Sequence, residues 1–425
     1  MGHDLRSRLE RLQRSGELGP LRPAAAARQK EAPGKAFAFL FPGEESLEQT
    51  GAGCCYLREL SFPLQRRHGA YTLAESLNCR GSNLALLARD RTLPPIEPSR
   101  FLFLDVETTG LAGGTGTWVF LIGLGWIEGD SFRLRQYFLR HPAEEEAMMC
   151  HFGAFAAPFS GLITFNGKAF DVPLIQTRQL LRRTPHIIAP RAHLDLLTCA
   201  RTLWKERFPS RSLGYLEESL LGFRRSGDIP GEEIPAVYFN YLRRGETALL
   251  KKVFEHNVYD ILSMAVLLGR IASTAAAARP DHPAESYALG RLYHEAGDLE
   301  KALHYYRQVT GSKAGPLEEA ALLQLGQICK KEEKWAEAVA CWQELASRDR
   351  GNLEAQVELA KYYEHRARDY ASALYWSEKA LAEACRCSGL PFSSLCHPAA
   401  LRHRIRRLRR KMAQQKISAG LGAVE

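Results

Sequence analysis

The sequence of 425 residues has no long run of purely apolar residues. Its longest uncharged stretch, Thr108–Ile127, spans 20 residues, but the first half is rich in glycine and threonine. Only Trp118–Trp126 is strongly apolar, and nine residues suit one buried strand rather than a helix that crosses a bilayer. The first 15 residues carry charges of both signs and lack the apolar segment of a secretory signal. We therefore expect a cytoplasmic protein without a membrane span.

Cysteine is also scarce, with 10 residues that show no paired framework. This usage indicates free thiols in a reducing compartment. One group, Cys385, Cys387, Cys396 and His397, could suggest zinc, but its spacing is not that of a standard zinc knuckle. A composition of 45% hydrophobic and 25% charged residues is that of a folded globular chain. It excludes a disulfide scaffold and wholesale disorder.

Positive charge is concentrated at the C-terminal end. The chain has a formal net charge of +9, and from Arg386 onward nine Lys and Arg face one acid, Glu425, which gives 9 − 1 = +8. Such a tail could bind a phosphate backbone through release of counterions, or it could be a solvated helix end. A nucleic-acid enzyme upstream would favour the first interpretation.

The apolar pattern divides the chain into five segments. They are a helical or flexible lead-in (1–35), an accessory segment (36–98), an α/β domain (99–273), a helical repeat domain (284–385) and the basic tail (386–425). Within the α/β domain, three successive apolar strands at 101–106, 117–126 and 131–139 precede helices that alternate with strands at 161–165 and 192–197. This order predicts a mixed five-stranded sheet flanked by helices.

The segment after the α/β domain contains an internal repeat. Small residues recur at spacings of 34 to 36: Gly290, Gly326 and Ala360 in one series, and Ala302, Ala338 and Ala373 in another. Paired helices of this length with small residues at their contacts resemble tetratricopeptide repeats. Such a stack usually binds a partner, so we expect an unidentified protein ligand here. We expect the aromatic residues Tyr305, Trp335, Tyr362 and Trp376 to belong to the repeat core rather than to a ligand cage.

Two acidic residues end the first strand of the α/β domain. Asp105 and Glu107 follow four apolar residues, and strand alternation points residues i and i+2 to the same face. Two carboxylates in such a position are costly unless their charge is compensated, and a divalent cation would do so.

Further polar residues occur at the ends of later elements. Asp171 follows a buried strand, with Asn166 in the intervening turn, and His256 precedes Asp260 by one turn of a helix. Oxygen ligands favour Mg²⁺ or Mn²⁺, and two such ions about 4 Å apart can drive phosphodiester hydrolysis. A neutral histidine beside them is a candidate general base.

These motifs resemble those of the DEDD exonuclease superfamily, which has a ribonuclease-H-like fold. The matching motifs are DxET at 105–108, N-x4-D at 166–171 and a third motif that ends at Asp260. With the repeats, LDVETTGLAGGTGT is similar to the YprB-like group of ribonuclease-H-like proteins. The resemblance implies a 3′–5′ exonuclease that uses two Mg²⁺ or Mn²⁺ ions on single-stranded nucleic acid or an end, DNA or RNA. It makes Asp105 a shared metal ligand, adds Glu107, Asp171 and Asp260 as ligands, and places Thr108 and Asn166 at the substrate.

The general base departs from the family pattern. One subgroup has a tyrosine four residues before the last aspartate and the other a histidine five residues before it, whereas here His256 stands at −4 and Tyr259 at −1. We favour His256, with Tyr259 or water alone as alternatives. Two other functions fit the sequence: a catalytically weak adaptor for nucleic acid and protein, and a phosphodiesterase that acts on short oligonucleotides.

Overall fold

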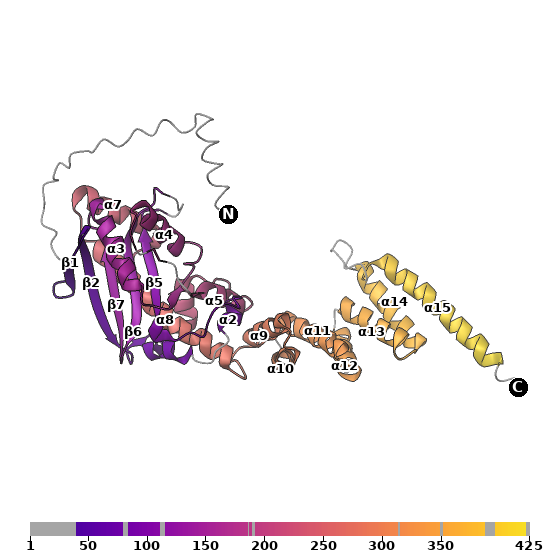
Figure 1. The fold of residues 1–425 in the computed structure, drawn as a ribbon. Helices are drawn as coiled ribbons and strands as arrows, with labels where there is room; N and C mark the ends of the chain where they lie inside the picture. The colour runs from indigo at the N-terminus through magenta and orange to yellow at the C-terminus, as the bar shows by residue number, and fades with distance from the viewer. Residues whose placement is uncertain are drawn as a thin grey trace, which may run out of the picture. The chain divides into compact units, whose positions relative to one another are not determined.

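The structure is a computed structural model that describes residues 40–79, 84–110, 115–185, 187–188, 192–312, 315–348, 352–386 and 396–421, the last with side chains to 415. The chain divides into two compact units, Met1–Pro42 and Gly43–Glu425. Every helix and strand below belongs to the second unit (Figure 1). The lead-in predicted for residues 1–35 lies outside the described residues.

A mixed sheet forms the centre of the α/β region, with strand order β1-β2-β7-β6-β5-β8-β9. The strands are β1 (Glu45–Thr50), β2 (Gly53–Pro63), β5 (Phe101–Thr108), β6 (Val119–Glu128), β7 (Ser131–Phe138), β8 (Gly161–Thr164) and β9 (His193–Asp195). Strands β5, β6 and β7 form an antiparallel meander, whereas β8 pairs parallel with β5 and β9 parallel with β8. The predicted mixed sheet with flanking helices is confirmed and is consistent with a ribonuclease-H-like fold.

The prediction of five strands was wrong, because the accessory segment adds two strands to the same sheet. Strand β2 pairs antiparallel along β7, from Tyr56 opposite Phe138 to Pro63 opposite Ser131, and β1 pairs with β2. Without β2, the edge of β7 would present a row of unpaired backbone N–H and C=O groups. The partners lie far apart in the chain, so the local pattern of residues 36–98 did not reveal the pairing.

Helix α8 (Leu250–Ala276) packs closely on the central strands. It is long and apolar enough to cross a membrane, but 78% of its apolar window is buried inside the protein, as in a core helix. Two glycines of β6 permit the close approach. A Cβ on Gly123 would lie 2.1 Å from Oδ1 of Asn257, and one on Gly125 would lie 2.6 Å from the Cγ2 atom of Ile261. The glycines therefore let α8 bring its polar residues to β5.

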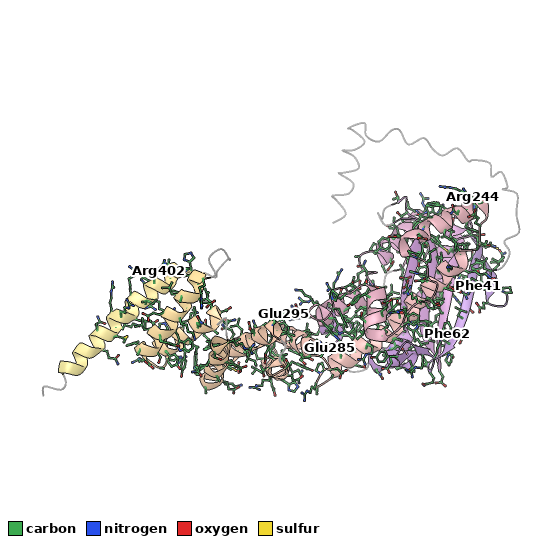
Figure 2. The ribbon with its side chains drawn as sticks, turned by 180° about the vertical axis from the view of Figure 1, so that it is seen from behind. Phe41, Phe62, Arg244, Glu285, Glu295 and Arg402 are labelled. Atoms are coloured by element: carbon green, nitrogen blue, oxygen red, sulfur yellow. The ribbon has the colours of Figure 1, made fainter. Side chains whose placement is uncertain are left out.

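Shorter elements complete the α/β region. They are β3 (Arg67–His68), β4 (Tyr71–Thr72), η1 (Leu73–Cys79), α2 (Leu84–Leu87), η2 (Pro98–Arg100), η3 (Pro142–Glu144), α3 (Glu145–Ala156), α4 (Asp171–Leu181), α5 (Leu196–Trp204), α6 (Leu213–Leu216), η4 (Glu217–Leu221), η5 (Gly231–Glu233) and α7 (Ile234–Arg244). The buried Glu145 pairs with Arg178 and Arg182, and this joins α3 to α4. Trp204 Nε1 of α5 donates to Oε1 of Glu285, labelled in Figure 2, at 2.8 Å.

The C-terminal region is helical. Its elements are α9 (Pro283–Ala296), α10 (Leu299–Val309), α11 (Pro316–Lys331), α12 (Trp335–Ser347), α13 (Leu353–His365), α14 (Tyr370–Arg386) and α15 (Pro398–Leu421). Helices pack as the pairs α9 with α10, α11 with α12 and α13 with α14. A Cβ on Gly290 would lie 2.8 Å from the Tyr306 ring, and one on Gly326 would lie 2.3 Å from Nε1 of Trp342, so both glycines stand at close helix contacts. Assignment of these pairs as tetratricopeptide repeats stays a prediction.

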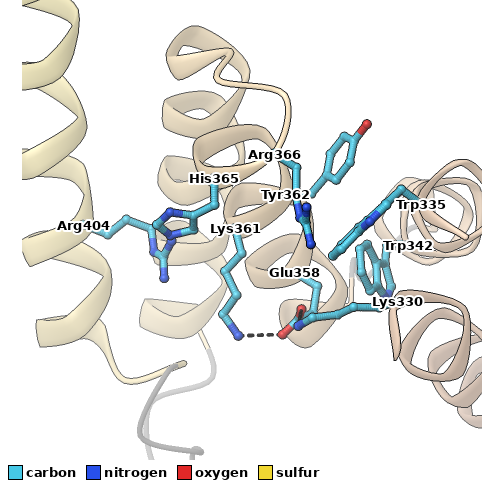
Figure 3. A pocket seen from close by; sticks show the side chains of 9 residues that line it. All are labelled: Lys330, Trp335, Trp342, Glu358, Lys361, Tyr362, His365, Arg366 and Arg404. Carbon is cyan, nitrogen blue, oxygen red and sulfur yellow. Dashed lines mark hydrogen bonds and ion pairs between the residues drawn. The ribbon is translucent and has the colours of Figure 1, made fainter. Parts of the chain in front are cut away.

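The aromatic residues predicted for the repeat core are not all equally buried. Tyr305 is buried, whereas Trp335, Tyr362 and Trp376 are partly buried and pack against the core. Trp335 and Tyr362 stack with ring centroids 5.8 Å apart and line a pocket of about 270 Å³ (Figure 3).

Candidate active site

The end of β5 carries the first two acidic residues. Residues Phe101–Leu104 are buried in the sheet, and the half-buried Asp105 and Glu107 follow on one face of the strand. In the register of the sheet, Asp105 lies opposite Gly123 of β6. Because Gly123 has no side chain, α8 can approach this face and enclose the carboxylates.

Asn257 of α8 holds Asp105 in place. Its Nδ2 donates to Oδ2 of Asp105 at 2.9 Å, and its own Oδ1 accepts from Nε2 of Gln136 at 2.9 Å. Gln136 also donates to the carbonyl oxygen of Phe254 at 2.8 Å, so β5, β7 and α8 are joined through one buried amide pair. Asn257 was not among the residues predicted from the sequence, and its position three residues before Asp260 is the signal that could have found it.

Three candidate residues meet closely enough to bind one ion. Glu107, His256 and Asp260 each offer a ligand atom, and these atoms all lie within 4.8 Å of one another. Nε2 of His256 lies 3.4 Å from Oδ2 of Asp260. Two elements distant in sequence, β5 and α8, therefore supply one potential metal centre.

Asp171 lies beside this cluster but is not one of its three members. It is the first residue of α4 and is buried. Burial, followed by repulsion from Asp195 and Asp260, raises the pKa of Asp171 to about 7. Asp195, which the sequence analysis missed, ends β9 and accepts hydrogen bonds from the backbone N–H of Asn166 at 2.9 Å and of Leu197 at 3.0 Å.

The two residues predicted to contact substrate have different surroundings. Asn166 has a positive φ of 70° and lines a groove of about 570 Å³ that also exposes Asp105 and Asp260. Thr108 is buried, and its hydroxyl donates to the carbonyl oxygen of Gly110 at 3.0 Å. Only Asn166 of this pair lines the groove.

Electrostatic repulsion characterises the site. Burial raises the pKa of Asp105 well above its usual range, and the charges of Asp260, Glu107 and Asp171 add to the effect. Burial and the same two aspartates, Asp260 and Asp171, likewise raise the pKa of Glu107. A divalent cation would offset this repulsion, and carboxylate oxygens are the ligands that suit Mg²⁺ or Mn²⁺.

An arginine that the sequence analysis missed reaches the same cluster. Nη2 of Arg225 donates to Oδ1 of Asp260 at 2.5 Å, and its Nε and Nη2 atoms lie 2.8 and 2.6 Å from the two carboxylate oxygens of Glu217. Nη1 of Arg225 lies 3.1 Å from Oδ2 of Asp228. The guanidinium thus supplies positive charge beside Asp260, from a loop between η4 and η5 whose sequence carries no recognisable motif.

Asp228 also contacts the imidazole of the cluster. Nδ1 of His256 lies 3.0 Å from each of the two carboxylate oxygens of Asp228. Tyr259, the alternative base, packs against Phe223 with ring centroids 5.4 Å apart and has Arg225 5.8 Å from its ring centre. The structure thus brings His256 to the carboxylates and turns Tyr259 to an aromatic neighbour.

Two grooves meet at Asp260. One contains Asp105 and Asn166 together with Arg201 and Arg211. The other, of about 600 Å³, contains Glu217, Arg225, Asp228 and His256. Asp105 and Asp260 are therefore accessible from a surface that also carries cations.

The chain is similar to several known proteins. A family model described as RNase_H superfamily matches residues 102–272. A Bacillus subtilis (strain 168) protein, "Uncharacterized protein YprB", is 33% identical over 338 residues, which cover 78% of this chain and 81% of that protein. Among solved structures, the family B DNA polymerase from the hyperthermophilic archaeon Pyrobaculum calidifontis matches at 16% identity with a TM-score of 0.34. That match covers 50% of this chain and 30% of the polymerase chain. The chain therefore belongs to the same family as YprB and contains a nuclease-like domain of the RNase_H superfamily.

Proposed function

We propose that the protein is a metal-dependent nuclease, a DEDD-type 3′–5′ exonuclease that hydrolyses phosphodiester bonds of single-stranded nucleic acid. The observation that carries the proposal is the meeting of Glu107, His256 and Asp260 within 4.8 Å, beside Asp105. Repelling carboxylates gathered in a groove are costly for stability, and a functional cation site explains their arrangement. The membership in the RNase_H superfamily supports the same class of reaction.

The metal ligands of the proposal are Asp105, Glu107, Asp171 and Asp260, and the ions are Mg²⁺ or Mn²⁺. When bound, two such ions would activate water and stabilise the leaving oxygen. His256 accepts the proton at Nε2, because its Nδ1 is engaged by Asp228. The exposed Arg201 and the half-buried Arg211 line the groove with Asp105 and would hold substrate phosphate.

The C-terminal helices have a separate role in this proposal. The helix pairs α9 to α14 form a tetratricopeptide stack that binds a protein partner, and the protein works in the cytoplasm. Polarity of cleavage and the number of ions come from the family resemblance described above.

One observation favours a second candidate, an adaptor that binds nucleic acid with little catalysis. Arg225 already places a guanidinium 2.5 Å from Asp260 and pairs with Glu217. A fixed cation compensates carboxylate charge without a metal ion. In the adaptor, Arg225 therefore replaces a metal ion at Asp260.

Degradation of end-labelled single-stranded DNA and RNA tests the proposal. Purified protein is assayed with Mg²⁺, Mn²⁺ or EDTA beside Asp105→Ala, and the exposed turn variant Asp130→Ala is the matched control. The nuclease predicts a metal-dependent ladder that Asp105→Ala abolishes and Asp130→Ala retains. The position of the label reports polarity, and a series of shortened substrates separates a polymer exonuclease from an enzyme for short oligonucleotides.

Thermal unfolding of the same variants addresses the adaptor. A nuclease site should raise Tm with Mg²⁺ or Mn²⁺ in the parent protein and not in Asp105→Ala, because binding to the folded state alone stabilises it. The adaptor would be supported if the folded protein shows no change in Tm with Mg²⁺ or Mn²⁺ and cleaves neither DNA nor RNA.

A further inference from the structure

Helix α15 has a buried apolar face. Leu401, Ile405 and Leu408 recur at i, i+4 and i+7 and are all buried, and the helix packs against α14. The basic tail predicted for 386–425 therefore contains a helix over Pro398–Leu421, and Leu401, Ile405 and Leu408 form an apolar face on it that is already covered.

One flank of α15 uses its cations to anchor the helix. Arg404, Arg407 and Lys411 all pair with Glu364 of α13, at N–O distances of 2.8, 2.7 and 3.0 Å. The Glu364 side chain is fully buried, and Figure 3 shows Arg404 extending from its helix toward the helix that carries His365. Burial opposes ionisation, but hydrogen bonds from Arg407 and Lys411 lower the pKa of Glu364 to about 2. These three cations are structural.

Three other arginines, Arg402, Arg406 and Arg410, form a stripe on a different side. They are spaced by four residues, are exposed, and make no ion pair or hydrogen bond with any residue that the structure describes. Arg402 is labelled in Figure 2. Because a helix turns about 100° per residue, the stripe lies far around the helix from the flank that binds Glu364.

We propose that Arg402, Arg406 and Arg410 bind the phosphate backbone of the nucleic-acid substrate at a surface separate from the catalytic groove. The inference rests on the proposed function. Four residues of helix rise by about 6 Å, so the stripe spans about 12 Å. Along that span, each of the three exposed guanidinium groups can contact a phosphate of a nucleic-acid strand.

The side chains of α15 favour a nucleic-acid backbone over a membrane surface as the ligand. Arginine binds phosphate in a bidentate manner, and α15 contains no Phe, Tyr or Trp on which bases could stack. Binding should therefore depend on salt and not on base sequence. A membrane surface fits less well, because an interfacial helix needs a free apolar face and that of α15 is buried against α14.

The test measures binding without catalysis. Full-length Asp105→Ala protein in EDTA is titrated with fluorescent single-stranded DNA and RNA of mixed sequence over a series of salt concentrations. The same titration is made with two variants of the Asp105→Ala protein. One carries the triple change R402Q/R406Q/R410Q, and the other carries R402K/R406K/R410K, which retains the charges. Circular dichroism and Tm verify that the variants are folded.

The Gln triple should weaken binding at low salt and reduce the slope of log K against log salt by about 2, since each lost contact to a single strand contributes about 0.7. The Lys triple should keep that slope. The proposal would be overturned if the Gln triple kept the parent slope and affinity. It would also be overturned if the Lys triple lost as much slope and affinity as the Gln triple. Equally tight, stripe-dependent binding to phosphatidylserine vesicles would overturn it in favour of a lipid surface.

Cleavage assays separate failure of this inference from failure of the proposed function. In a background with Asp105 intact, the Gln triple should raise KM for long strands and leave kcat unchanged. If the Gln triple cleaves with an unchanged KM, the proposed phosphate-binding surface is wrong and the proposed nuclease activity stands. A stripe-dependent salt slope in a protein that cleaves nothing would support the surface and reject the nuclease.

Discussion

His256 and Asp228 form a pair in which Nδ1 of the imidazole lies 3.0 Å from both carboxylate oxygens. The other ring nitrogen, Nε2, then faces Asp260 at 3.4 Å. A carboxylate at Nδ1 fixes both the tautomer and the orientation of an imidazole. Asp228 is thereby assigned as a positioning residue for His256.

Replacing Asp228 tests this role. Asp228→Asn should lower kcat by about 10- to 100-fold with little change in KM, because outer partners of a site orient its residues without touching substrate. Steady-state kinetics with the end-labelled substrate measures both constants, and Asp130→Asn is the control in an exposed turn. A parent-like kcat in folded Asp228→Asn would contradict the role, as would a change in KM alone.

Two residues of α8, His256 and Tyr259, are candidates for the general base, and substitutions distinguish them. His256→Gln should reduce the rate by about 10²- to 10⁴-fold, the usual contribution of general acid–base catalysis. Tyr259→Phe should keep most activity, because the Tyr259 ring packs against Phe223 and the substitution retains the ring. Single-turnover cleavage rates provide the comparison. If the tyrosine variant were the inactive one, the assignment of His256 would be wrong.

Gly123 sets the distance between α8 and the sheet. In Gly123→Ala the new methyl group would meet Oδ1 of Asn257 at 2.1 Å, which forces the amide away from Asp105. Overpacking of this kind costs about 1–3 kcal/mol of stability, and metal affinity should fall as well. Denaturant unfolding and isothermal titration with Mn²⁺ measure the two effects. Gly116→Ala is the matched control, since nothing lies within 4 Å of its Cβ; equal behaviour of both variants would refute the spacing argument.

Glu364 makes the attachment of α15 dependent on pH. Its pKa is lowered in the folded protein from 4.5 to about 2, so its stabilising effect is complete above the ordinary value and is lost as the pH falls toward 2. Glu364→Gln should therefore lower stability by on the order of 2 kcal/mol at neutral pH. The difference from the parent should shrink below about pH 4.5.

Paired melting curves at several pH values check this dependence, with the exposed Glu354→Gln of α13 as the control. A deficit that stays constant from neutral pH into the acid range would show that Glu364 acts by packing rather than by its charge.

Some features of the site follow from periodicity within one element. Strand alternation predicts that Asp105 and Glu107 share a face, and helix spacing predicts the same of His256 and Asp260. The three apolar strands predicted at 101–106, 117–126 and 131–139 likewise correspond to β5, β6 and β7. Each inference needs only the local geometry of the backbone.

Pairings between distant segments could not be predicted in this way. Strand β2 pairs with β7 because an open sheet edge needs hydrogen-bond partners. The residue pattern of neither strand indicates which other strand it pairs with. Asn257 reaches Asp105 only because Gly123 lets the helix approach, and Arg225 and Asp228 reach Asp260 and His256 from an irregular loop.

The basic tail illustrates the same division. Its sequence alone determined that excess positive charge gathers after Arg386. Only the tertiary structure decided which charges are used internally, because Arg404, Arg407 and Lys411 converge on the buried Glu364 whereas Arg402, Arg406 and Arg410 stay exposed. Identical side chains differ in role here because burial and the position of a partner carboxylate depend on how separate helices pack.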